Sequence, residues 1–174
     1  MPSSRRLITS TTLSSSAASV TFSSIPSTFT DLVVRVSTRS SIANTQSNIA
    51  IELNSDSSAI YSATFLFMTG ATAYSQGWSG DTYGRTYGNT VGSTATSNTF
   101  SNFELYLPSY TGNQNKAFGT FGVTENNSAN NATITATANL YRSTTAISTI
   151  RFFNNDSSNF VSGSSFYLYG LLDS

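Results

Sequence analysis

The sequence predicts an all-β protein, an antiparallel two-sheet β-sandwich that is jelly-roll-like and closed by a C-terminal inner strand. Three observations lead to this fold class. Apolar and polar residues alternate with the period of a strand along most of the chain, and no segment shows a helical period. Turn residues interrupt the alternation about every 8–15 residues. The chain also ends on SSFYLYGLLDS, which would be an aggregation hazard as an exposed tail but suits a strand inside a sheet.

The first half of the chain supplies five of the expected strands. They occupy residues 6–12, 18–22, 31–40, 48–56 and 61–70. Pro26 marks a strand boundary because proline cannot donate a hydrogen bond to a neighbouring strand. Residues 31–40 alternate, with Leu32, Val34 and Val36 on one face. Residues 61–70 are more continuously apolar, which predicts a strand covered on both faces.

The second half supplies the remaining strands, for a total of roughly nine or ten. They occupy residues 102–110, 116–126, 131–142, 146–156 and 164–172. Gly119 and Gly122 indicate a bulge or a close backbone approach. In the last strand Phe166 and Leu168 share one face. An up-and-down barrel is the structural alternative to the two-sheet jelly roll.

The length suits a single domain that spans residues 1–174. Between about residues 71 and 97 the pattern is less regular and rich in Gly, Thr and Tyr. We therefore expect one β-sandwich domain with an irregular loop insertion at 71–97.

The composition excludes several classes of function. Lys and Arg number 8, as do Asp and Glu, so zero net charge gives no electrostatic case for nucleic acid or an anionic membrane. A neutral chain suits a component of an assembly, although Ser, Thr and Asn could simply serve to solubilise it. The absence of Cys and His removes thiolate sites and Ser-His-Asp triads. No apolar run approaches the roughly 20 residues of a membrane helix. We expect no cofactor.

The carboxylates give little support for catalysis. Glu52 and Glu104 fall at outward positions of alternating strands, where a solvated charge is the default. Asp56 and Asp156 lie in NSDSS and NNDSS, which are turn signatures. Calcium in these turns lacks the loop pattern of a known calcium site. We expect neither an enzyme nor a metal site.

The irregular stretch holds the sharper candidate, a contact loop. Its members are Trp78, Asp81, Tyr83, Arg85 and Tyr87. Aromatic rings beside a carboxylate can anchor a protein partner or grip a sugar. Three interpretations stay open: packing on its own domain, contact with a subunit or capsid, and glycan binding.

Three stretches of the chain also carry a family pattern. They cover residues 7–41, 98–127 and 154–174, and include a turn into a strand at Ser24 to Leu32 and a final F-x-L-Y-G strand at Phe166 to Gly170. In these features the chain resembles uncharacterised tailed-bacteriophage virion structural proteins with a β-sandwich domain. The resemblance spans most of the chain outside 71–97, and its motifs are turns and strands rather than chemistry.

The resemblance implies a trimer on the exterior of the virion, as capsid decoration, head fibre or tail appendage. We expect a capsid decoration protein that binds the major capsid protein or another virion protein and stabilises the head by passive packing. The alternative is a tail-appendage or head-fibre receptor-binding module that contacts host surface glycan. A polysaccharide-degrading domain is a third hypothesis. Fold-level likeness does not choose among these roles.

Overall fold

The computed structural model describes residues 4–127 and 131–172, and the named strands in this part of the chain pair antiparallel throughout. Its strands are β1 (Ser4–Thr12), β2 (Ser19–Phe22), β3 (Asp31–Thr38), β4 (Gln46–Ser47), β5 (Ile49–Leu53), β6 (Tyr61–Thr69), β7 (Thr72–Asp81), β8 (Gly84–Arg85), β9 (Thr90–Val91), β10 (Ser101–Leu107), β11 (Lys116–Thr124), β12 (Thr133–Tyr141), β13 (Ile150–Asn154) and β14 (Ser165–Leu172). The described residues contain no helix, and so none that could cross a membrane.

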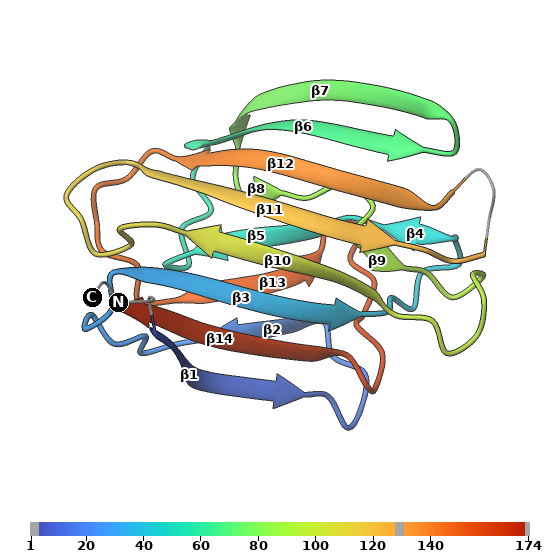
Figure 1. The fold of residues 1–174 in the computed structure, drawn as a ribbon, viewed down its shortest axis with the longest axis horizontal. Coiled ribbons are helices and arrows are strands. Elements are labelled where there is room, and N and C mark those ends of the chain that lie inside the picture. Colours follow the sequence, from blue (N-terminus) through green and yellow to red (C-terminus); the bar gives the residue numbers. More distant parts are fainter. Residues whose placement is uncertain (1–3, 128–130, 173–174) are drawn as a thin grey trace.

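The strand order is that of a jelly roll with one enlarged sheet. The larger sheet has eight strands in the order β1-β14-β3-β10-β11-β12-β6-β7, and the smaller has four in the order β2-β13-β5-β8. The two sheets form the layers of the sandwich, with the larger sheet in front of the smaller one in Figure 1. The strands β1, β14, β3 and β10 together with the smaller sheet have the strand order of a jelly roll, and β11, β12, β6 and β7 enlarge the front layer. The predicted fold class is confirmed.

The core lies between the two layers and is rich in phenylalanine. The ring of Phe152 on β13 lies 6.4 Å from Phe22, 6.2 Å from Phe103 and 5.6 Å from Phe166, measured between centroids. Each of these side chains is at most 4% exposed. The alternation read from the sequence places them inward because successive strand residues point to opposite faces.

The C-terminal strand is an inner strand, as predicted. β14 pairs with β1 on one side and with β3 on the other. Phe166 and Leu168 are fully buried. Gly170 lies under the ring of Phe29, where an added Cβ would come within 2.2 Å of the ring. β14 is therefore held within the sheet along its length.

Gly122 shows the close approach that the sequence indicated. A Cβ there would lie 2.6 Å from Cβ of Phe103 and 2.8 Å from the side chain of Asn89. Gly119 has no such neighbour, and the pairing of β10 with β11 is regular through both glycines. The close approach is confirmed at Gly122, and the structure shows no bulge at either position.

Two expectations about the middle of the chain are corrected. Residues 61–70 were expected to be covered on both faces, but Leu66 and Met68 on β6 are 57% and 47% exposed. The smaller sheet lies on one side of the larger sheet, where β8 contacts β6, and the other face of β6 has no layer over it among the described residues. The stretch 71–97, expected to be irregular, contains β7, β8 and β9. Glycines and the brevity of β8 and β9 obscured their strand period.

Candidate interaction surface

The residues of the predicted contact loop are brought together beside β6. Trp78 lies on β7 and its ring stacks on Phe65, with centroids 4.2 Å apart. The guanidinium of Arg85 lies 5.2 Å from the Trp78 ring and 5.2 Å from the Tyr83 ring. Arg85 Nη2 donates to Asp81 Oδ1 at 2.7 Å, and this hydrogen bond raises the pKa of Arg85. Four of the five predicted residues thus form one cluster.

The aromatic rings of this cluster contact their own domain. Tyr87 stacks on Phe67 at 3.9 Å, and Tyr83 meets Phe153 edge-on at 5.6 Å. Trp78, Tyr83 and Tyr87 are all half-buried. Packing accounts for much of their surface, so their role as a contact for another molecule stays a prediction.

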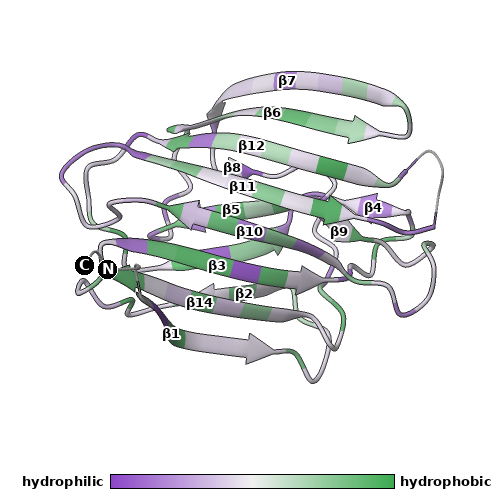
Figure 2. Ribbon diagram, in the orientation of Figure 1, coloured by the Kyte–Doolittle hydropathy of each residue, from purple (hydrophilic) through white to green (hydrophobic). Residues whose placement is uncertain are grey.

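The outer face of the larger sheet carries a feature that the sequence analysis did not single out. Strand registers align Met68, Ile134 and Val123 in one cross-strand row, and Leu66, Ala136 and Phe121 in the next. We call these six residues the apolar patch. Phe121, Leu66, Ile134 and Met68 are 59%, 57%, 52% and 47% exposed. Hydrophobic segments lie side by side on β6, β12 and β11 in Figure 2.

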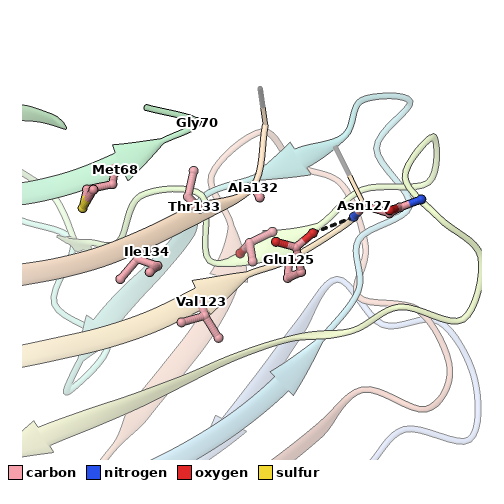
Figure 3. A pocket seen from close by; sticks show the side chains of 9 residues that line it. Met68, Gly70, Val123, Glu125, Asn127, Ala132, Thr133 and Ile134 are labelled. Atoms are coloured by element: carbon pink, nitrogen blue, oxygen red, sulfur yellow. Dashed lines mark hydrogen bonds between the residues drawn. The ribbon is translucent and has the colours of Figure 1, made fainter. Parts of the chain in front are cut away.

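One end of the apolar patch borders a hollow of about 730 Å³. Figure 3 shows Met68, Ile134 and Val123 on one side of it, with Glu125 and Asn127 farther along. The backbone N–H of Asn127 donates to Oε1 of Glu125 at 2.8 Å, which ties this carboxylate to its own loop. The side of the hollow nearest the patch is thus lined by the aliphatic side chains of Met68, Ile134 and Val123, and the charged group lies farther from it.

The same two rows continue into a polar half of the face. Glu104 Oε2 accepts from Arg35 Nε at 3.0 Å and lies 3.4 Å from Arg5 Nη1. Such exposed ion pairs contribute about 0–1 kcal/mol each. Phe121 and Tyr167 border a depression whose lining includes Arg35 and Glu104. This half of the face therefore combines charged groups with aromatic rings.

The other carboxylates considered for catalysis have local partners. Glu52 lies 3.5 Å from Arg151 Nη1. The Ser58 hydroxyl and N–H donate to Asp56, and with a bond from Tyr141 they lower its pKa. Burial raises the pKa of Asp156, but hydrogen bonds from Ser158 and Ser47 outweigh it and lower the pKa overall. Within the described ranges, no group of three or more Asp and Glu could hold a metal ion.

The patch was missed because its members were considered strand by strand. Its signal was present, since 61–70 is apolar at successive positions and Phe121 and Ile134 sit out of phase with the buried residues of their strands. Finding it required the pairing of β6 with β12 and of β12 with β11. Sequence periodicity does not give that order.

Fold and surface together define a jelly roll with an exposed apolar face, and comparisons with known proteins add no family. No family model and no curated protein matches the chain. A solved scytalido-glutamic peptidase with a transition state analog inhibitor is 11% identical, with a TM-score of 0.22, over 93% of this chain and 66% of that chain. The CBM2 module of the evolved Dit of Lactobacillus casei BL23 phage J-1 is 10% identical, with a TM-score of 0.18, over 90% of this chain and 69% of that chain. At these values neither similarity bears on function.

Proposed function

We propose that the chain is a non-enzymatic structural protein on the exterior of a bacteriophage virion, and specifically a capsid decoration protein. The observation that carries this proposal is the apolar patch. Single exposed apolar side chains are ordinary on a protein surface, but a contiguous group on three adjacent strands marks an interaction site. The resemblance of the sequence to phage virion proteins supplies the setting.

The mechanism is passive packing. The patch lies against the major capsid protein or another virion protein and removes its exposed rings and aliphatic chains from water. A protein bound only to the assembled lattice stabilises that lattice by mass action. The zero net charge of the chain permits close packing of many copies without mutual repulsion.

Copy number and particle stability test this role. Quantitative mass spectrometry of purified virions should find the chain at a copy number comparable to the capsid lattice sites. Particles that lack it should release their genome at a lower temperature and should still adsorb to host cells. A handful of copies per particle, with unchanged thermal release, would contradict a decoration role.

Variants of the patch test the surface itself. Replacing Leu66 and Phe121 together by Ser removes two large exposed side chains without touching the core. Each contributes about 1.5–3 kcal/mol when fully buried, so affinity for particles should fall at least about tenfold. Leu7→Ser is the matched control, because Leu7 is 50% exposed but lies on β1 outside the patch. Equal particle binding by the double variant and the wild type would refute the surface.

A second candidate, a receptor-binding appendage, is favoured by the depression in the polar half of the face. Its charged groups suit sugar hydroxyls, and its rings suit the apolar faces of sugars. In this role Arg35→Ala with Tyr167→Ala would abolish adsorption to the host while leaving the particles thermally stable. These changes test the role more cleanly than alanine at Trp78, which also removes packing.

A further inference from the structure

The strand β7 lies at one edge of the larger sheet and is exposed along nearly its whole length. It pairs with β6 along one edge, and the described residues provide no strand for its other edge. All its residues are exposed except Trp78 and Asp81, which are half-buried. In Figure 1 it forms one border of the sheet, opposite β1.

From Thr72 to Ser79 the free edge of β7 lacks the features that normally prevent edge-to-edge association, and the one irregularity of the strand lies beyond them, at Gly80. Proteins protect such edges with Lys, Pro, bulges or short strands. β7 runs for 10 residues as TAYSQGWSGD, without Lys, Arg or Pro and with its single charge at the last position. Its register with β6 is regular from Thr72 to Ser79. Thr72 to Ser79 therefore offer an uninterrupted row of backbone donors and acceptors.

The opposite edge is protected in the usual way. β1 carries Arg5 and Arg6, and its pairing with β14 is interrupted by an irregularity between Leu7 and Thr9. Pairing β7 of one copy with β1 of another would also join unlike edges, and such a contact either closes into a ring of several copies or continues as an open-ended filament. The contrast between the edges favours a contact of β7 with itself.

The sequence of β7 is self-complementary about Gln76. In an antiparallel pair related by a two-fold axis at this residue, position 76+n lies opposite position 76−n. Trp78 of each copy then faces Tyr74 of the other, and Ser75 faces Gly77. Aromatic cross-strand pairs stabilise sheets, and this register places no like charges opposite one another. Tyr74, Gln76 and Trp78 pair with Phe67, Phe65 and Ala63 of β6 and so lie on one face.

We propose that β7 pairs antiparallel with β7 of a second copy of this chain, about a two-fold axis at Gln76, so that two larger sheets join into one. The contact closes on itself because both partners use the same edge. It gives a dimer, whereas the resemblance to phage proteins implies a trimer. It uses the sheet edge and leaves the apolar patch free, so it stands independently of the proposed function.

A charge-swap experiment tests both the edge and the axis. Gln76 is exposed, so Gln76→Lys and Gln76→Glu preserve the fold. Each places two like charges directly opposite across the axis, which should weaken self-association about tenfold or more. An equimolar mixture places Lys opposite Glu and should restore the dimer. Ser10→Lys, which adds the same charge to the exposed side of β1, is the matched control.

Sedimentation equilibrium provides the measurement. The wild type and Ser10→Lys should both sediment as dimers, with twice the chain mass of 18.5 kDa. Each Gln76 variant alone should sediment as a monomer, and an equimolar mixture of the two should sediment as a dimer. Thermal melts of each variant verify folding. A monomeric wild type, a trimer unaffected by Gln76→Lys, or a mixture that stays monomeric would each overturn the pairing.

Discussion

Replacing Phe166 with Ala should remove a large part of the stability of the domain. The Phe166 side chain is fully buried, and its ring centroid lies 5.6 Å from that of Phe152 and 5.2 Å from that of Phe160. Three rings meet there from β13, β14 and the chain between them, so neighbours cannot collapse into the space without breaking other contacts. Phe→Ala changes at such sites cost about 3–5 kcal/mol. The free energy of unfolding of the whole domain is expected to be only about 5–15 kcal/mol.

Urea unfolding followed by circular dichroism measures this loss, with Tyr167→Ala as the matched control. Tyr167 is the next residue of β14 but points outward and is 36% exposed. Its replacement should cost under about 1 kcal/mol. For a chain of this length, the melting temperature of Phe166→Ala should fall by about 6–20 °C. Equal losses at the two positions, or a loss below about 1 kcal/mol at Phe166, would refute the inward assignment of this face.

Two further predictions concern the closing strand and the turns. Truncation after Gly163 removes β14, which takes from β1 its partner strand and leaves β3 unpaired along one edge, so the product should show no cooperative melt by calorimetry. A truncated chain that melts near the intact one would make the strand dispensable. Hydrogen bonds from Ser58 hold the pKa of Asp56 below its ordinary value of 3.8. The charged carboxylate therefore stabilises the fold fully above pH 3.8, and this stabilisation is lost as the pH falls through the lower pKa of the folded state. Urea titrations from about pH 5 to pH 2 should show a smaller acid loss for Asp56→Asn than for the wild type.

The sequence was sufficient for the fold class because strands such as β3 alternate in the chain as they do in their burial. Leu32, Val34 and Val36 alternate in the chain and all are buried in the structure. The inner position of the last strand followed from its apolar and aromatic composition, which an exposed tail would leave in water. The two-residue strands β4, β8 and β9 were not predicted, because a period of two has no meaning over two residues. These strands form only through partners that are distant in sequence, such as Gln46 with Val91.

The candidate surface shows a limit of a different kind. An apolar run such as 61–70 indicates that both faces of a strand avoid water, but the sequence does not state whether the second face is covered by the same chain or by another molecule. In the structure Phe65 is 2% exposed and its neighbour Leu66 is 57% exposed, so one face is covered within the domain and the other is not. If the pattern reflects burial in the functional state, the exposed face is covered by a partner. The exposed half of this run therefore supports the proposed assembled function, because contiguous apolar side chains left in water are typical of surfaces that bind another molecule.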